Sequence, residues 1–150
     1  MSAGVKELTR QHRECDDHLS RCESALMKPD FVVAARHFTL FSLALDEHLQ
    51  LEENKLFPAF EKATGNSAGP TSVMRSEHTE IRALRDEAAE AIRREQSKHA
   101  LGVIDTLNVM LQQHNVKEEN VLYPMCEQHI PGMTSLLGLG SPCCGACSCG

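Results

Sequence analysis

The stretch EHLQLEENKLFPAFEK, residues 47–62, has a counterpart later in the chain, QHNVKEENVLYPMCEQ, residues 113–128. When each residue is paired with the one 66 positions further on, the two stretches share one His, three Glu, one Asn, one Leu and one Pro. Phe57 then pairs with Tyr123. A repeat of this kind predicts a duplicated helical hairpin with approximate two-fold symmetry.

The residues around the repeat are typical of helices. Leu, Ala, Glu, Arg and Gln, which are good helix formers, dominate the sequence, and no stretch alternates steadily between apolar and polar residues. Proline and glycine mark the ends of four helical segments. We expect these segments at about residues 5–27, 30–64, 70–95 and 98–130. Long helices with short connections predict an all-α fold, an up-down-up-down four-helix bundle built from the duplicated hairpin.

Two prolines fall inside the predicted helices. Pro58 lies in the second segment and Pro124 in the fourth, at equivalent places of the repeat. Proline lacks an N–H, and its ring clashes with the preceding turn. Each of the two is therefore predicted to kink its helix or to end its regular part.

The composition limits the kinds of partner. With 150 residues, 41% of them hydrophobic, the chain can form one domain with one core. A net charge of −6 argues against binding to nucleic acid or to an anionic membrane surface, since either needs a basic face. The most apolar stretch, residues 31–45, is interrupted by Arg36 and His37 and is too short to span a bilayer. The first residues show no apolar signal core, so we expect a cytoplasmic protein.

The repeat also carries a set of metal-binding side chains. In His48 and Glu52 a spacing of four places both side chains on one helix face, about 6 Å apart. The second hairpin has the same His-x-x-x-Glu pattern, and the first and third helices each add one His, 36 residues before the His of the pattern. Four imidazoles and two carboxylates should thus meet at one level of the bundle. The candidate ligands are His12, His48, Glu52, His78, His114 and Glu118.

The residue types indicate which metal such a site would hold. A carboxylate buried in a bundle is costly unless a cation meets it. Zinc usually takes four ligands, often with thiolates, and no Cys repeats with this pattern. Two bridging carboxylates with two His per ion favour a pair of irons, although manganese or zinc could occupy the site in part. Ferritin-like di-iron enzymes have Glu-x-x-His instead, with the acid first and a spacing of three.

Four segments resemble the hemerythrin-like domain of the HHE cation-binding family: LTRQHRECD, EHLQLEENKLFPAF, GPTSVMRSEHTEIRAL and QQHNVKEENVLYPM. The resemblance covers roughly residues 5–130. It implies a non-haem di-iron centre, bridged by an oxide or hydroxide ion, on the six candidate ligands. The oxygen-carrying hemerythrins have a fifth His one turn after the third, where this chain has Arg82. Asp16 stands at the symmetric place, and whether it is a ligand or a residue behind the ligands is left open.

The resemblance implies a binding protein rather than an enzyme. Its expected partner is dioxygen or a related small oxidant, bound for sensing, storage or delivery. The alternative is a stress-response protein that answers nitric oxide or peroxide, or an iron donor for cluster repair. A redox enzyme of the carboxylate di-iron class is disfavoured by the His-rich ligand set.

The end of the chain differs in composition from the rest. Residues 133–150 are rich in small residues and Cys, so we predict a bundle over residues 1–132 followed by a flexible Cys-rich tail. Four Cys could form an additional site for a soft metal. They are Cys143, Cys144, Cys147 and Cys149. The alternative is a thiol-rich end without fixed structure.

Overall fold

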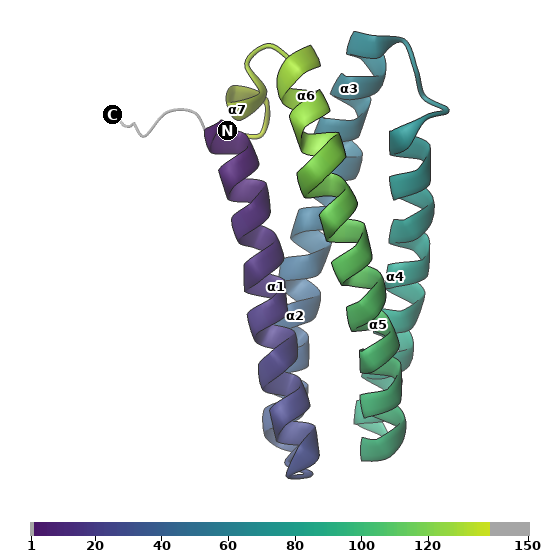
Figure 1. Cartoon of the computed structure of the whole chain (residues 1–150). Coiled ribbons are helices and arrows are strands. Elements are labelled where there is room, and N and C mark those ends of the chain that lie inside the picture. Colours follow the sequence, from purple (N-terminus) through teal and green to yellow (C-terminus); the bar gives the residue numbers. More distant parts are fainter. Residues whose placement is uncertain (1, 139–150) are drawn as a thin grey trace.

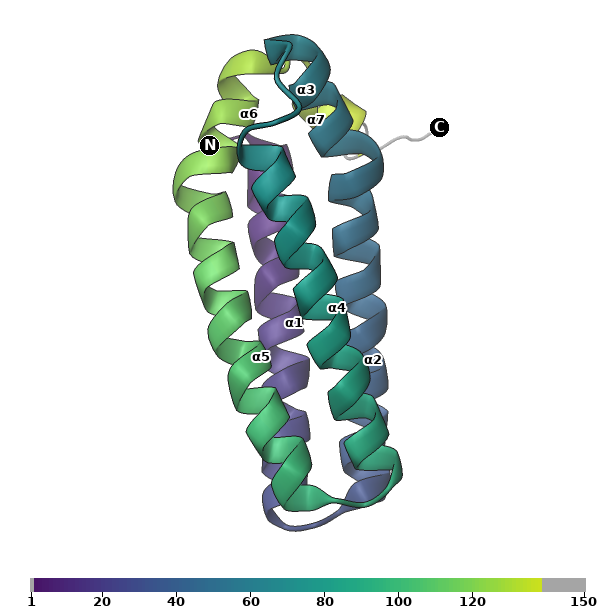
Figure 2. The ribbon, with the colours of Figure 1, turned by 90° about the vertical axis from the view of Figure 1, so that its right-hand side faces the viewer.

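The computed structural model of the chain describes residues 2–138, and this part is helical throughout. Four long helices lie side by side and alternate in direction (Figures 1 and 2). They are α1 (Ala3–Met27), α2 (Phe31–Leu51), α4 (Pro70–Arg93) and α5 (Ser97–Lys117). α1 packs mainly on α2 and α4 on α5, and the two hairpins meet where α2 contacts α4 and α1 contacts α5. The predicted all-α four-helix bundle is confirmed.

The helices begin and end at residues suited to those positions. The side chains of Ser2 and Asp30 accept hydrogen bonds from the first free N–H groups of α1 and α2, both at 3.1 Å. Pro70 starts α4, where its missing N–H costs nothing. Gly65 ends the second helical segment with φ of +69°, a conformation that glycine adopts without strain.

The second and fourth segments are each interrupted by one π-helical turn. η1 (Glu52–Leu56) joins α2 to α3 (Phe57–Thr64), and η2 (Glu118–Leu122) joins α5 to α6 (Tyr123–His129). In both turns an N–H bonds to the carbonyl five residues earlier, Phe57 to Glu52 and Tyr123 to Glu118. Each proline sits just after this wider turn, which relieves the clash between its ring and the preceding turn. The prolines thus end the regular α-helix as predicted, but the chain continues without a sharp break.

Two apolar clusters form the core and lie on either side of a polar layer. The large cluster fills the end of the bundle near residues 28–30 and 94–96. Its largest buried side chains include Leu19, Leu26, Phe41, Ile81, Ile104 and Leu107. The small cluster fills the other end, between the start of α1, the segments α3 and α6, and a short helix, α7 (Met133–Leu136). It contains Leu8, Leu56, Phe57, Phe60, Leu122, Tyr123 and Cys126. The polar layer lies where the π turns begin.

The short helix α7 packs against the start of α1. Met133 and Leu137 are both 4% exposed and belong to the small cluster, and the N–H of Gly4 donates to Thr134 Oγ1 at 3.1 Å. The sequence placed the end of the bundle at residue 132. The packed part reaches Leu137, because these two apolar side chains cover the end of the small cluster.

The four Cys of the predicted soft-metal site lie outside the described residues, and that site remains a prediction.

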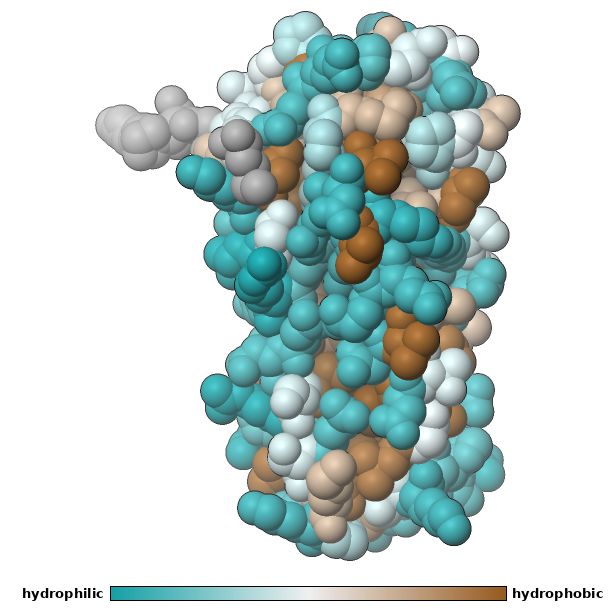
Figure 3. Space-filling view, viewed as in Figure 1, coloured by the Kyte–Doolittle hydropathy of each residue, from teal (hydrophilic) through white to brown (hydrophobic). Residues whose placement is uncertain are grey.

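The surface carries few large apolar side chains. Figure 3 shows a mainly hydrophilic face on which the apolar patches are separated from one another. Exposed Val109, Val116 and Val121 follow one another along α5 and η2, with at least one full turn between neighbours. Within residues 2–138 there is no helix with the length and apolar character needed to cross a membrane.

Candidate metal centre

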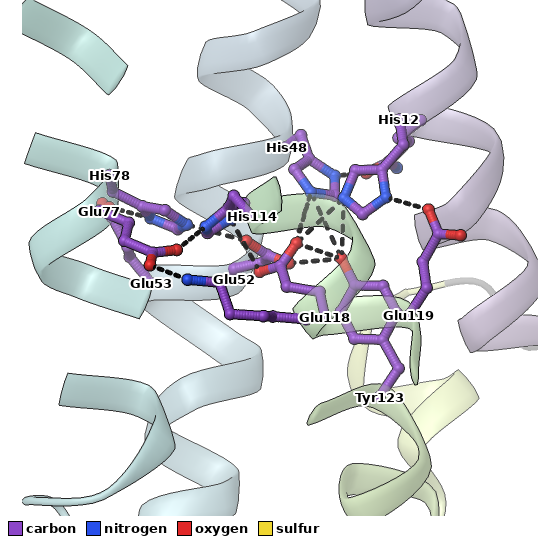
Figure 4. Close-up of polar contacts among 12 residues, drawn as sticks. His12, His48, Glu52, Glu53, Glu77, His78, His114, Glu118, Glu119 and Tyr123 are labelled. Carbon is purple, nitrogen blue, oxygen red and sulfur yellow. Dashed lines mark hydrogen bonds and ion pairs between the residues drawn. The ribbon is translucent and has the colours of Figure 1, made fainter. Parts of the chain in front are cut away.

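Side chains from all four long segments converge on one level of the bundle, where the π turns begin (Figure 4). His12 comes from α1, His48 from α2, Glu52 from η1, His78 from α4, His114 from α5 and Glu118 from η2. All six are buried, with exposed fractions of 4% or less. The structure therefore brings together every side chain that the sequence predicted as a ligand. That they bind metal remains a prediction.

The donor atoms form two groups of four that share both carboxylates. The His12 group consists of His12, His48, Glu52 and Glu118, and the His78 group of Glu52, His78, His114 and Glu118. In each group the four donor atoms lie within 4.8 Å of one another. Each carboxylate turns one oxygen toward each group. Glu52 Oε2 lies 3.4 Å from His48 Nε2, and Glu52 Oε1 lies 3.1 Å from His78 Nε2. Two ions held here would be bridged by both glutamates.

The His78 group contains buried polar atoms that lack hydrogen-bond partners. They are Glu52 Oε1, Glu118 Oε2, His78 Nε2 and His114 Nε2. Such atoms are rare in folded proteins, because each loses its hydration at a cost of about 1–3 kcal/mol. Here they face each other across 3.1 and 3.2 Å without forming hydrogen bonds. Donor atoms arranged in this way fit a cation between them, so the residues present suit a pair of metal ions.

Each histidine is held by a second polar side chain on its outer nitrogen. His12 Nδ1 lies 2.7 Å from Glu119, His48 Nδ1 2.7 Å from Gln11, His78 Nδ1 2.6 Å from Glu53, and His114 Nδ1 2.8 Å from Glu77. An Nδ1–H that donates to these oxygens leaves the Nε2 lone pair directed into the centre. Each bond joins neighbouring helical segments, so the four rings are fixed by the packing of the bundle.

The family profile of the Hemerythrin HHE cation binding domain matches residues 3–126. The chain belongs to this family. The resemblance stated from the sequence motifs is thereby confirmed, and the buried His and Glu groups are those of a cation-binding domain suited to two metal ions. The search of curated proteins and the search of solved structures returned no match.

This HHE domain has Arg82 where the oxygen-carrying hemerythrins have a further histidine. The guanidinium of Arg82 donates two hydrogen bonds to Glu53, at 2.7 and 3.0 Å. Burial alone would raise the pKa of Glu53, but the bonds from Arg82 and His78 outweigh it and lower that pKa. Arg82 therefore acts on His78 through Glu53 and adds no donor atom to the centre. Asp16, at the symmetric position, is in neither donor group and accepts a hydrogen bond from Gln112 Nε2 at 2.9 Å.

Tyr123 is a further polar residue of the HHE centre and is not among the six candidate ligands predicted from the sequence. Its side chain is fully buried, and its hydroxyl donates toward Glu52 Oε2 at 2.6 Å and Glu118 Oε1 at 2.9 Å. The same oxygen lies 3.2 Å from His12 Nε2 and 3.4 Å from His48 Nε2. Burial and the two carboxylates raise the pKa of Tyr123 well above its usual value, so the phenol is neutral when no cation is bound.

The titrating groups of the HHE centre compensate one another's charge. Burial alone would lower the pKa of His48 and His114, but the two glutamates outweigh it and raise these values to about 10 and about 9. Burial would raise the pKa of Glu118, but His114, His12 and His48 hold it well below its usual value. Without a bound cation the site thus pairs ionised Glu118 with protonated His48 and His114. A metal ion bound here would take the place of those protons.

A small cavity of about 190 Å³ opens from the surface beside this centre. Its lining includes Asp16, Gln112, Asn115, Glu119 and the ring of His12. Two of its lining residues, His12 and Glu119, are bonded to each other at 2.7 Å through His12 Nδ1. The cavity is large enough for a few waters or a diatomic molecule.

Proposed function

We propose that this chain is a non-haem di-iron protein that binds dioxygen or a related small oxidant for sensing, storage or delivery. The observation that supports it best is the sharing of Glu52 and Glu118 by both donor groups. Six protein ligands for two ions leave coordination positions free for a small molecule. When bound, a pair of irons supplies a redox-active place for a diatomic ligand.

The donor set supports iron over a structural zinc site. Each group offers two imidazoles and two carboxylates, and Zn sites that serve structure are usually closed by four ligands that often include thiolates. Among the described residues the three cysteines lie outside both groups. Burial raises the pKa of Cys15, Cys22 and Cys126 to about 12, so they are thiols when no cation is bound.

The protein's own residues prepare the site for a small ligand. Gln11, Glu53, Glu77 and Glu119 orient the four rings, while the apolar clusters on both sides exclude water from the layer. Water exclusion strengthens every charge interaction inside the layer and favours small, weakly hydrated molecules over polar ones. These features support a gas- or oxidant-binding role more than a role in hydrolysis.

A second candidate function is a response to nitric oxide or peroxide, or donation of iron for cluster repair. Arg82 favours it, because the side chain at that position is bonded to Glu53 and adds no nitrogen donor beside His78. The ion held by the His78 group would then have one protein ligand fewer than in the oxygen-carrying hemerythrins. A more open ion favours reaction over reversible carriage.

Metal analysis with an oxygen titration tests both candidates. Protein purified from cells grown with iron should contain close to two irons per chain, one for each donor group. One tightly held zinc and no iron would overturn the proposal. If anaerobic addition of oxygen to the reduced protein gives a stable charge-transfer band that vanishes when oxygen is removed, binding is the function. Fast, irreversible conversion to the ferric form supports the second candidate.

A further inference from the structure

The internal repeat makes the two metal positions directly comparable, residue by residue. The pairing that relates positions 66 residues apart maps His12 and His48 onto His78 and His114. The same pairing maps Tyr123 onto Phe57, and these two residues follow the two π turns at equivalent places. Any chemical difference between Tyr123 and Phe57 is therefore a difference between the two metal positions.

The Tyr123 hydroxyl contacts all four donors of the His12 group. It lies 2.6–3.4 Å from Glu52 Oε2, Glu118 Oε1, His12 Nε2 and His48 Nε2. Figure 4 shows this hydroxyl beside the carboxylates of Glu52 and Glu118 and below the rings of His12 and His48. An ion bound to these atoms at the usual distance of about 2.0–2.2 Å would lie within bonding range of the phenol oxygen.

Phe57 gives the other position an apolar neighbour. Its ring is fully buried, with its centroid 5.5 Å from that of His78, and it offers no donor atom. All four donor atoms of this His78 group are buried without a hydrogen-bond partner. The two positions therefore share both glutamates and have equivalent histidines, but among the described residues only the His12 group has a fifth polar atom, the Tyr123 oxygen, at its donor atoms.

The backbone holds Tyr123 in this place. A π turn bonds residues five apart, so Tyr123 comes to lie over Glu118, to whose carbonyl its own N–H is bonded. The ring stacks on that of His12 with centroids 5.8 Å apart, and the small apolar cluster encloses the rest of it. The phenol thus has little room to move away when an ion binds.

The outer partners of the histidines also differ between the two groups. His114 is bonded to Glu77, whereas its counterpart His48 is bonded to the neutral Gln11. The His12 group therefore has one outer acid fewer than the His78 group, where Glu53 and Glu77 are paired with Arg82 and Lys117. The outer partners thus make the two positions chemically unequal as well.

We propose that Tyr123 is a fifth protein ligand, through its phenolate oxygen, to the ion held by His12 and His48, and that small exogenous ligands therefore bind to the ion held by His78 and His114. This inference rests on the proposed di-iron function. As the oxygen–metal bond forms, the O–H bond breaks and the proton leaves to solvent, with no change in oxidation state. A bound cation favours the ionised phenol, in the way that metals lower the pKa of other ligands.

The repeat itself supplies the matched variants for a test: Tyr123→Phe removes the phenol, and Phe57→Tyr adds one at the symmetric position. The ferric wild type should show a visible phenolate-to-iron charge-transfer band and resonance-enhanced tyrosinate ring vibrations. Tyr123→Phe should lose both while retaining its iron, and Phe57→Tyr should strengthen both. Melting of the metal-free variants serves as the control for folding.

Azide, as a small anionic probe, locates the open position. The ferric wild type should bind a single azide, Tyr123→Phe should bind a second, and Phe57→Tyr should bind azide at least tenfold more weakly than the wild type. A wild type that contains two irons but lacks tyrosinate vibrations would overturn this inference and leave the di-iron proposal intact. Two azides on the wild type would overturn the assignment of the open position. A chain that takes up no iron would instead overturn the proposed function.

Discussion

The large apolar cluster and the polar layer occupy neighbouring lengths of the same four helices, yet they meet opposite physical demands. In the large cluster, side chains such as Phe41 and Leu107 are fully buried and gain stability from removal from water alone, about 1.5–3 kcal/mol each. In the layer, Glu52 and Glu118 are buried to the same degree, and each costs free energy unless a positive charge meets it. The bundle therefore has one region that folds it and one that depends on a cation.

This difference explains how an HHE domain can hold a costly site. Both hairpins extend well beyond the layer, and the large cluster joins residues from all four long helices. The small cluster closes the other end with α3, α6 and α7. The polar layer thus lies between two packed apolar clusters. Its donor atoms are held in position because the neighbouring residues of each helix are packed.

Replacing a large side chain in the apolar region should have the greatest effect on stability. Phe41→Ala removes a fully buried ring from the large cluster and should lower the free energy of unfolding by about 3–5 kcal/mol. The loss should be the same with and without iron, because the ring belongs to neither donor group. Denaturant unfolding of both forms measures it, and the iron content should stay near that of the wild type. A loss confined to the iron-loaded form would contradict the separation of the two regions.

Replacing a shared carboxylate should affect the iron-loaded form alone. Metal that binds only the native state adds about 4 kcal/mol at a thousandfold excess over its dissociation constant. Glu52→Ala removes one bridge, so iron should be lost and this advantage should disappear. The metal-free form should suffer little, because His48, whose pKa Glu52 raises, can lose its proton once this buried acid is removed, and the Tyr123 hydroxyl keeps Glu118 as an acceptor at 2.9 Å. Thermal melts with and without iron measure both effects.

Glu47→Ala is the matched control for this variant. Glu47 is exposed and lies on the same segment, one residue before His48. Its replacement should leave both melts and the iron content unchanged. If Glu52 served only in a structural ion pair, the metal-free form of Glu52→Ala would lose about 3–5 kcal/mol. A wild type that melts at one temperature with and without metal would exclude the di-iron interpretation.

The candidate ligands of the polar layer could be predicted from the sequence. The contacts of Gln11 and Glu77 with the outer nitrogens of the histidines could not. The spacing of His48 and Glu52 fixes both side chains on one helix face, and the repeat singles out their counterparts, so local geometry was sufficient. Gln11 and Glu77 each precede a ligand by one residue, but each bonds to a histidine of the neighbouring helix. Only the packing of the two helices decides that contact. Gln11 and Glu77 are 66 residues apart, as the paired residues of the repeat are. This was the one feature of the sequence that indicated an equivalent role for the two side chains.

The π turns are a second feature that pattern reasoning did not give. Pro58 and Pro124 predicted a kink or an end of the regular helix. Both a break in the helix and a wider helical turn agree with that prediction. The wider turn forms because the helix on both sides of it is packed, so the chain keeps its direction and shifts its hydrogen bonds instead. Tyr123 reaches the donor atoms through this turn, and so its role could not be read from helical spacing.

Replacing an outer partner should have a smaller effect than replacing a ligand. Glu53→Gln keeps an acceptor near His78 Nδ1 but removes the charge that makes the ring a better donor to metal, and it breaks the pair with Arg82. Residues behind metal ligands typically contribute between about 10- and 100-fold in metal affinity. Competition with a chelator should show a loss in this range without a change in stoichiometry. Glu80→Gln, at an exposed position of α4, should show no loss.

Removing the end of the chain should have the smallest effect on the bundle. The six candidate ligands lie between His12 and Glu118, and the last buried residue of the described part is Leu137. A chain truncated after residue 140 should therefore keep the iron content, the helical signal and the melting temperatures of the full chain.

The four Cys that it lacks lie outside the described residues, and thiolates are preferred ligands of soft metals. If they form a separate site, truncation should lower the binding of added Zn(II) or Cu(I), and titration of both chains measures this. Unchanged binding of these metals would instead support a thiol-rich end without a metal site. Loss of the di-iron absorbance on truncation would show that the polar layer depends on residues beyond those that now enclose it.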